Sequence, residues 1–346
     1  MSERLTFSIT EVSQVAEVRR QVAATASTHG LNEPAVGKVA LVVTEIATNL
    51  VKHTTGGQLL VRTLQHEDGN GLEILALDKG PGIANVSECL RDGYSTTGSP
   101  GTGLGAIARL STVFDMYSLP GRGTALLAQI WPEDHRQKFA GRTQEGGNGS
   151  SLEIGAVCVA KPGEEVSGDA WAVEQHAGYS LIFVADGLGH GPSAAKAAHK
   201  AVRIFHERST LVPTAILEEV HLALQSTRGA AAAVTVVDAS QQVVKFAGVG
   251  NIAGEVVAAA GNRKMVSHSG TLGHAMRKTQ EFTYPWPTKA LLVMHSDGIG
   301  THWTLDAYPG LITRHPSLIA AVLYRDHSRG RDDSTVVVAK NRSHKQ

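Results

Sequence analysis

Four aspartates in the second half of the chain stand beside strand-like hydrophobic runs, where their carboxylates could share one cation site. Asp169 occurs in SGD, Asp186 in ADG, Asp297 in SDG and Asp332 in RDDST. A single Asp-Gly pair is usually a turn, but four carboxylates at strand ends repel one another unless cations neutralise them. Hard oxygen ligands select Mg²⁺ or Mn²⁺, and two such ions can bind a phosphate and lower the pKa of a bridging water.

A carboxylate and an amide, Glu45 and Asn49, lie four residues apart in the first half of the chain. On a helix this spacing places both side chains on one face, beside the apolar stripe. An Asn oxygen can bind Mg²⁺, and a Glu can orient or deprotonate an attacking hydroxyl. Taken alone, the same spacing is more often a solvated polar flank, so the pair needs further support.

Glycine-rich segments follow Asp78, which ends a strand-like run. In DKGPG, Gly80 and Gly82 would let an adenine ring approach the backbone, and the Asp78 carboxylate suits an adenine amino group. The later run RDGYSTTGSPGTGLG holds five glycines in fifteen residues and leads into a helix. This pattern indicates a mobile lid and a phosphate-binding helix N-terminus, although flexible surface loops can look similar.

The elements that must position these residues form two domains in a chain of 346 residues. The polar, glycine-rich segment 133–151 indicates a linker, which leaves domains at 1–132 and 152–341. Both belong to the α/β (α+β) class, the first as a sheet with helices on one face and the second as two stacked sheets flanked by helices. In the first domain we expect a helix introduced by a capping box at Ser8-x-x-Glu11, helices over 34–53 and 104–113, and strands over 58–64, 72–77 and 124–131. In the second domain we expect helices over 193–205 and 214–224, and strands over 154–160, 181–185, 232–238, 243–247, 291–294 and 335–339.

Composition limits the partners and the compartment. Lys+Arg and Asp+Glu are 32 each, so no global field recruits nucleic acid or an anionic membrane. Two cysteines cannot build a disulfide framework, which fits a reducing cytosol. The N-terminus lacks the apolar core of a signal peptide, and no stretch approaches the roughly 20 apolar residues of a membrane span. We therefore expect a cytoplasmic protein that holds charged ligands locally.

Over residues 6–132, the ordered set of an Asn helix, DxGxG, a GxGxG helix and a final GRGT before a strand resembles the GHKL (Bergerat) ATP-binding fold. Within it, TEIATN and DGYSTTG…GTGLG resemble the serine/threonine kinases of bacterial stress-response partner switching, the RsbT type. The resemblance implies ATP and Mg²⁺ as cofactors, with Asn49 holding Mg²⁺, Glu45 as the general base and Asp78 binding adenine. The nucleotide-contacting residues that it also implies are Gly80, Gly82, Gly101, Gly103, Gly105 and Thr124.

Over residues 152–340, the order GD…ADGxGHG…SDG…DDxT resembles the PPM-type phosphatases, an αββα sandwich, and specifically their SpoIIE/RsbX-like branch. The resemblance implies two Mn²⁺ or Mg²⁺ ions bridged by Asp186, one of them reached by the Gly187 carbonyl. Asp297 and Asp332 would complete the second metal, and Asp169 would bind a metal or its water. Asp332, not Asp333, matches the family ligand. The phosphate-binding arginine of eukaryotic relatives has no evident counterpart here.

The two resemblances together imply a bifunctional kinase and phosphatase. Its substrate would be Ser or Thr of a small partner-switching regulator, by resemblance a STAS-domain protein, and a homodimer is left open. The alternative is a phosphatase fused to a non-catalytic, ATP-gated anti-sigma-type binding module. Glu45 argues against it, because a pure binder needs no carboxylate there. A histidine-kinase-like ATPase half is disfavoured because no helical phosphoacceptor segment precedes the domain.

Overall fold

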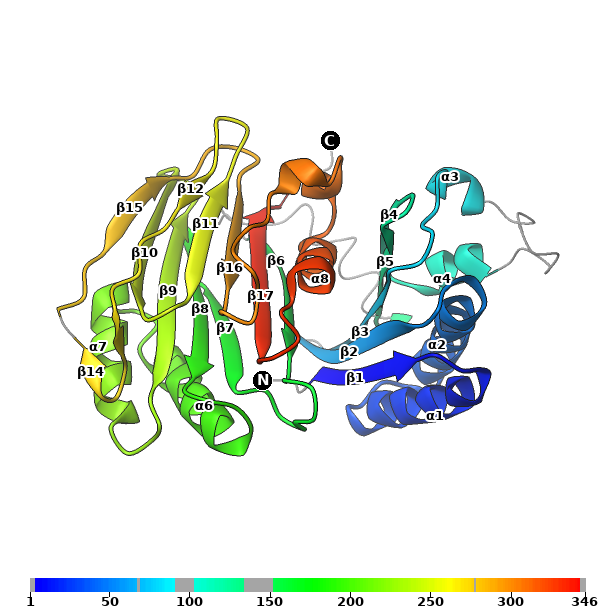
Figure 1. Ribbon diagram of the computed structural model, residues 1–346, viewed down its shortest axis with the longest axis horizontal. Helices are drawn as coiled ribbons and strands as arrows, with labels where there is room; N and C mark the ends of the chain where they lie inside the picture. Colours follow the sequence, from blue (N-terminus) through cyan, green and yellow to red (C-terminus); the bar gives the residue numbers. More distant parts are fainter. Residues whose placement is uncertain (1–3, 67–68, 91–102, 134–151, 277, 343–346) are drawn as a thin grey trace. The chain divides into compact units, whose positions relative to one another are not determined.

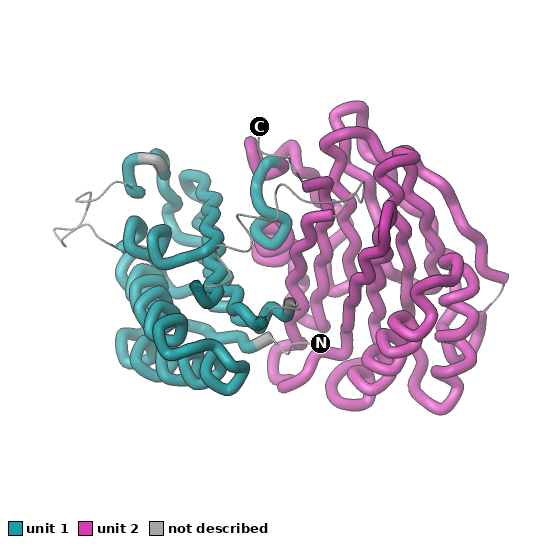
Figure 2. The backbone as a smooth tube through the Cα atoms, turned by 180° about the vertical axis from the view of Figure 1, so that it is seen from behind, with its two compact units in different colours: residues 1–145, 313–318 teal, residues 146–312, 319–346 magenta. Residues whose placement is uncertain are grey.

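The chain forms two compact units, coloured separately in Figure 2. The computed structural model describes residues 4–66, 69–90, 103–133, 152–276 and 278–342. Unit 1 contains residues 1–145 together with Thr313–Leu318, and unit 2 contains residues 146–312 and 319–346. The predicted linker, from residue 134 on, and most of the predicted lid, including Gly101, lie outside the described residues.

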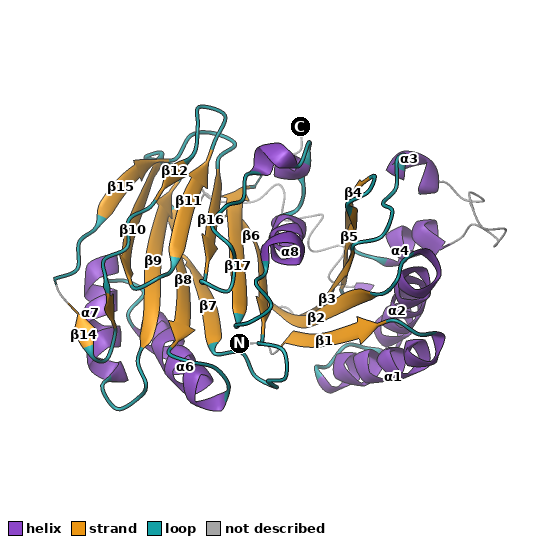
Figure 3. Cartoon of the chain, viewed as in Figure 1, coloured by secondary structure: helices purple, strands orange, loops and turns teal. Residues whose placement is uncertain are grey.

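Unit 1 is built on a five-stranded antiparallel sheet of strand order β1-β2-β3-β5-β4. Helices α1, α2 and α4 lie together along one face of this sheet (Figures 1 and 3), as the sequence predicts. The strands are β1 (Arg4–Ile9), β2 (Gly57–His66), β3 (Gly69–Asp78), β4 (Val113–Leu119) and β5 (Gly123–Ile130). The helices are α1 (Val12–Thr28), α2 (Glu33–His53), α3 (Val86–Cys89) and α4 (Gly103–Leu110).

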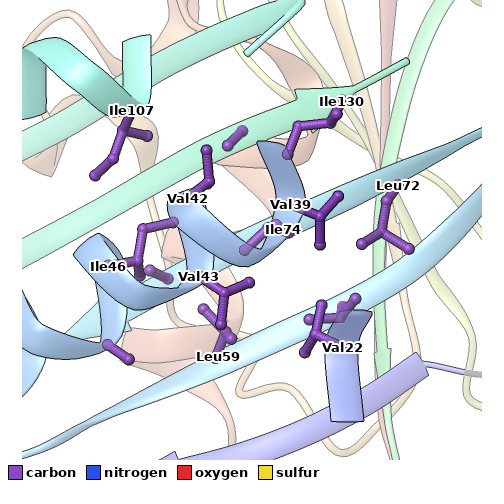
Figure 4. Close-up of a cluster of buried hydrophobic side chains, with 14 of the residues drawn as sticks. Val22, Val39, Val42, Val43, Ile46, Leu59, Leu72, Ile74, Ile107 and Ile130 are labelled. Carbon is purple, nitrogen blue, oxygen red and sulfur yellow. The ribbon is translucent and has the colours of Figure 1, made fainter. Parts of the chain in front are cut away.

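Helix α2 forms the centre of the unit 1 core (Figure 4). The Asn32 side chain caps its N-terminus by accepting from the backbone N of Ala35 (3.1 Å). By length and composition alone, α2 is also a candidate membrane span, which the sequence analysis did not predict. A core helix passes the same test, and Val39, Val43 and Ile46 are buried against the sheet. The apolar stripe of α2 thus has a packing role in unit 1.

The predicted capping box at Ser8 and Glu11 was wrong, and α1 begins later than it implies. Ser8 lies in β1, where it is paired with Gln58 of β2. Glu11 is instead the residue before the helix, and Gln14 Oε1 accepts from its backbone N (3.0 Å). The strand pairing of β1 therefore prevailed over the local capping pattern.

A buried carboxylate, Glu73 on β3, joins separate chain segments of unit 1. Arg62 Nε donates to Glu73 Oε1 (2.6 Å), and Gln129 Nε2 donates to Glu73 Oε2 (3.0 Å). Ser317 Oγ, from the segment Thr313–Leu318, donates to the same Oε2 (2.7 Å). Burial of a charge is costly unless it is paired and hydrogen-bonded, so each of these donors stabilises unit 1.

Unit 2 contains two five-stranded antiparallel sheets, which confirms the predicted stacked-sheet architecture. Their strand orders are β15-β10-β9-β8-β7 and β12-β11-β16-β17-β6. The strands of the first sheet are β7 (Asp169–Gln175), β8 (Tyr179–Gly187), β9 (Ala230–Asp238), β10 (Val243–Val249) and β15 (Phe282–Pro285). Those of the second are β6 (Leu152–Val159), β11 (Ala253–Val257), β12 (Arg263–Lys264), β16 (Leu291–His295) and β17 (Ser334–Asn341). The other elements of unit 2 are β13 (Gly270–Thr271), β14 (Ala275–Met276), α6 (Pro192–Glu207), α7 (Pro213–Leu224) and η1 (Leu305–Ala307). Two elements contain residues of both units: η2 (Leu311–Thr313) ends, and α8 (Pro316–His327) begins, in the segment Thr313–Leu318 of unit 1.

The side chains of β8 alternate between two hydrophobic clusters, one on each face of its sheet. Phe183 packs with Phe205 of α6 in the cluster under the helices, with ring centroids 5.1 Å apart. Val184, its neighbour in sequence, belongs to the cluster between the sheets, together with Val337 of β17. Successive strand side chains point to opposite faces, so Asp186, two residues after Val184, is carried toward the space between the sheets at the strand end.

Candidate active sites

In unit 1, Glu45 and Asn49 lie one turn apart on α2, both half-buried, and Gly103 faces both. A Cβ placed on Gly103 would lie 3.1 Å from Glu45 Oε2 and within 3.8 Å of the Asn49 amide atoms. The start of α4 thus meets the polar flank of α2. This arrangement brings three predicted site residues together at a helix N-terminus, where backbone N–H groups favour anions.

Asp78, at the end of β3, has its carboxylate oriented by the backbone of two predicted nucleotide-binding segments. Its Oδ1 accepts from the N of Gly80 (2.7 Å) and from the N of Thr124 (3.2 Å). The side chain is 9% exposed. The DKGPG turn and the start of β5 therefore meet at Asp78.

Two glycines around Asp78 are demanded by the backbone. Gly82 has φ +71° and Gly123 has φ +77°, a region that favours glycine. A Cβ on Gly82 would lie 2.0 Å from the Leu119 carbonyl oxygen, and one on Gly123 would lie 2.1 Å from the Asp78 carbonyl oxygen. Gly105 is buried within α4. The predicted glycines that the structure describes therefore lie at close backbone approaches or in the adjoining helix.

In unit 2, Asp169 and Asp186 are register partners on the paired strands β7 and β8. Directly opposed residues of an antiparallel pair project to the same face of the sheet. Ser296 Oγ, which follows β16 of the other sheet, donates to Asp169 Oδ2 (2.6 Å) and accepts from the Thr335 N (3.0 Å). Ser296 therefore connects the ends of both sheets through the carboxylate of Asp169.

Asp297 and Asp332 lie on loops beside β16 and β17. Asn251 Nδ2 donates to Asp297 Oδ2 (2.6 Å), which orients that carboxylate. Asp332 is exposed, whereas its neighbour Asp333 is buried and its Oδ1 accepts from the Lys161 N (2.9 Å). The carboxylate of Asp333 thus binds the backbone at Lys161, whereas Asp332 faces solvent.

The loop after Asp186 is held tightly. The N of Gly187 donates to the Gly168 carbonyl (3.0 Å), and a Cβ on Gly187 would lie 2.2 Å from the Ala194 carbonyl oxygen. The Nδ1 of His190 contacts Glu164 Oε1 at 2.6 Å. These contacts fix the path of the chain from β8 to α6.

The electrostatics of this cluster suit cations. Burial, followed by the charges of neighbouring carboxylates that begin with Asp169, raises the pKa of Asp186 to about 9. Burial likewise raises the pKa of Asp169 to about 7, and its Oδ1 is buried without a hydrogen-bond partner. Among the residues that the structure describes, no three His, Cys, Asp or Glu side chains are arranged as a metal site in their present positions. The donor chemistry nevertheless fits Mg²⁺ or Mn²⁺, because all donors are hard oxygens and one is unsatisfied.

Sequence reasoning missed the residues that position the carboxylates. Ser296 stands immediately before Asp297, and Asn251 ends the GVGN turn, but neither position signals a carboxylate partner that is distant in sequence. The Glu164–His190 contact spans 26 residues. Of these residues, only Ser296 could have been suspected from the sequence, because the hydroxyl of a serine beside a strand-end aspartate can donate to a neighbouring carboxylate.

Comparison with known proteins assigns a family to each half. The sequence matches the family described as "Histidine kinase-like ATPase domain" over residues 9–130, and "Stage II sporulation protein E (SpoIIE)" over residues 176–342. The first match corrects the expectation that disfavoured a histidine-kinase-like ATPase half. It is 33% identical over 94 residues to the serine/threonine-protein kinase RsbT of Bacillus subtilis (strain 168), a match that covers 27% of this chain and 71% of RsbT. Asp169 lies just outside the SpoIIE match.

Two solved structures are similar to part of this chain. A chain described under "The bacterial stressosome: a modular system that has been adapted to control secondary messenger signaling" is 30% identical, with a TM-score of 0.52. It covers 55% of this chain and 100% of its own length. A crystal structure of RsbX in complex with magnesium is 19% identical with a TM-score of 0.49, and covers 57% of this chain and 98% of its own.

Proposed function

Because this chain belongs to the RsbT-related histidine kinase-like ATPases and carries a SpoIIE-type, PP2C-class domain in the same chain, we propose that it is a bifunctional serine/threonine protein kinase and metal-dependent phosphatase. The observation that carries the proposal is that each unit gathers its own set of reactive side chains. Gly103 faces Glu45 and Asn49 in unit 1. In unit 2, neighbouring carboxylates that range from the buried Asp169 to the exposed Asp332 are close enough to contribute to the raised pKa of Asp186.

In the kinase half, the substrate ATP would bind with Mg²⁺ against α2 and α4. Asn49 would hold the Mg²⁺, and Asp78 would accept from the adenine amino group. Glu45 would accept the proton of the attacking Ser or Thr hydroxyl as the general base. Its half-buried carboxylate beside the α4 N-terminus supports this role. The glycine turns, Thr124 and the segment that includes Gly101 would contact the nucleotide.

In the phosphatase half, Asp186 would hold both of two Mn²⁺ or Mg²⁺ ions, and the Gly187 carbonyl would reach one. Asp297 and Asp332 would complete the second metal, and Asp169 would bind a metal or its water. When bound, the ions would supply a water of lowered pKa and neutralise phosphate charge. Asn251 and Ser296 orient the carboxylates of Asp297 and Asp169 before any ligand arrives.

The proposed partner is a small protein with a phosphorylatable Ser or Thr, of the STAS-domain kind. The relationship to RsbT supports partner switching as the setting. One unit would add the phosphate and the other would remove it, at the same site of the same partner. We propose a cytoplasmic location, no nucleic-acid or membrane partner, and leave homodimer formation to measurement.

The test uses the full-length chain with a recombinant STAS-domain protein, ATP and Mn²⁺, followed by intact-mass measurement. Asp186→Asn should accumulate phosphorylated partner, and Glu45→Ala should only remove phosphate from prephosphorylated partner. The wild type should consume ATP without net accumulation. ATP binding without phosphate transfer by the Asp186→Asn protein would favour the alternative, an ATP-gated binding module. Metal-independent hydrolysis by that variant would exclude the proposed phosphatase site.

A further inference from the structure

Three exposed arginines, Arg228, Arg329 and Arg331, lie on two loops that are hydrogen-bonded to the loops carrying the proposed metal ligands. They are called the arginine rim below. In the part of unit 2 that the structure describes, none of their guanidinium groups makes a hydrogen bond or an ion pair. The PP2C-class site proposed above needs a group that recognises the substrate phosphate, and the sequence offers no counterpart of the arginine that eukaryotic relatives use.

The loop that carries Arg228 is rigidly attached beside Asp186. The ladder of β8 and β9 pairs Asp186 with Ala231, and it is extended by the Leu188 N donating to the Gly229 carbonyl (3.0 Å). A Cβ on Gly189 would lie 3.1 Å from Arg228 Nη1. The guanidinium therefore lies over the loop that follows Asp186.

The turn itself holds Arg228 in place from both sides. Thr227 Oγ1 donates to the Leu224 carbonyl (2.7 Å) and accepts from the Gly229 N (3.0 Å). Gly229 has φ +81°, and a Cβ there would lie 2.5 Å from the Leu272 carbonyl oxygen. The backbone at Arg228 is therefore fixed, and its side chain is exposed.

The other two arginines of the rim lie beside the loops that carry Asp297 and Asp332. The Arg329 N donates to the Gly298 carbonyl (2.8 Å), directly after Asp297. Arg331 immediately precedes Asp332, which is itself exposed.

Two of the nearby carboxylates accept hydrogen bonds from side chains outside the arginine rim. Asp297 accepts from Asn251, and Asp169 accepts from Ser296. Guanidinium groups bind phosphate oxygens through paired, charge-assisted hydrogen bonds. We propose that the arginine rim binds the phosphoryl group of the phosphorylated Ser or Thr of the partner, an inference that rests on the proposed phosphatase function.

The experiment measures three quantities on full-length, Mn²⁺-loaded protein: KM and kcat for a phosphothreonine peptide, inhibition by inorganic phosphate, and peptide binding to the inactive Asp186→Asn protein. The triple variant Arg228→Ala/Arg329→Ala/Arg331→Ala should raise KM, the phosphate inhibition constant and the peptide Kd at least about tenfold. kcat should change less. Lysine at the three positions should restore part of the binding, because it keeps the charge but loses the fork geometry.

Controls separate this inference from the phosphatase proposal. Arg203→Ala removes another exposed arginine of unit 2, one paired with Glu207 on α6, and should leave all three quantities unchanged. Mn²⁺ affinity of the triple variant, measured by calorimetry, should match the wild type. If the wild type hydrolyses the peptide and the triple variant binds it equally well, the arginine rim has no such role. If the wild type with Mn²⁺ hydrolyses nothing, the phosphatase proposal fails, and this inference fails with it.

Discussion

Replacement of Gly103 with alanine tests whether α2 and α4 enclose a nucleotide site. The new Cβ would lie 3.1 Å from Glu45 Oε2, so this carboxylate must shift by a few tenths of an ångström, whereas the 3.7 Å to Asn49 Nδ2 is an ordinary contact. Overpacking of this kind costs about 1–3 kcal/mol, which corresponds to a roughly 5- to 150-fold loss of ATP affinity if it falls on the bound state. Gly103 is the first residue of α4 and is not among the glycines with positive φ, so alanine suits its backbone and the fold should not suffer.

The matched control is Gly37→Ala on α2, where a Cβ would meet nothing within 4 Å. It should bind ATP as the wild type does and unfold at the same or a slightly higher temperature. Binding of a fluorescent ATP analogue with Mg²⁺ to the full-length chain, together with the unfolding midpoint, decides the matter. If Gly103→Ala is folded and binds the analogue with wild-type affinity, the assignment of Gly103, Glu45 and Asn49 to one site is refuted.

Three further outcomes are expected. In metal-free protein, the raised pKa of Asp186 favours the folded state at low pH, and this contribution to stability is lost as pH rises toward 9. Asp186→Asn should therefore raise the unfolding midpoint more at pH 8 than at pH 5. Equal shifts at the two pH values would contradict the argument that burial raises this pKa. Asn49→Ala should weaken Mg·ATP binding, whereas Glu45→Ala should reduce phosphate transfer more than binding, as stopped-flow binding and single-turnover transfer would show. Ser296→Ala removes the donor to Asp169 Oδ2 and should lower the free energy of unfolding, measured in urea, by about 1–3 kcal/mol. It should also weaken Mn²⁺ binding. An unchanged Mn²⁺ affinity would show that Ser296 does not support the metal site.

The elements predicted well are those with strong periodicity and a clear boundary. Helix α2, with Asn32 as its cap and a regular apolar stripe, ends within a residue of the predicted position. Strand β4 was missed because Asp115 interrupts its apolar residues, and the pairing with β5 that stabilises it is visible only in the fold. Helix α8 was missed because its residues 318–324 are all buried, so no polar face marks a helical period.

The candidate sites were predictable in their residue types but not in their supporting contacts. Asp186 could be recognised because an aspartate beside glycine at a strand end is a local pattern. The hydrogen bond from Ser296 to Asp169 joins residues 127 positions apart and depends on the stacking of two sheets. The rim arginine Arg228 lies in a short turn that carries no motif. Local sequence therefore indicated which side chains are candidates for the two sites, and tertiary structure supplied the contacts that orient them.

The buried carboxylate of Glu73 has a consequence for how the protein is made. Its hydroxyl donor, Ser317, follows it by 244 residues, so a ribosome must synthesise nearly the whole chain before that contact can form. Unit 1 cannot be completed while it is the only part of the protein outside the ribosome. A fragment that ends in the glycine-rich segment after residue 132 would omit the same hydroxyl. The N-terminal half is therefore expected to reach its full stability only late in synthesis, after most of unit 2 has emerged.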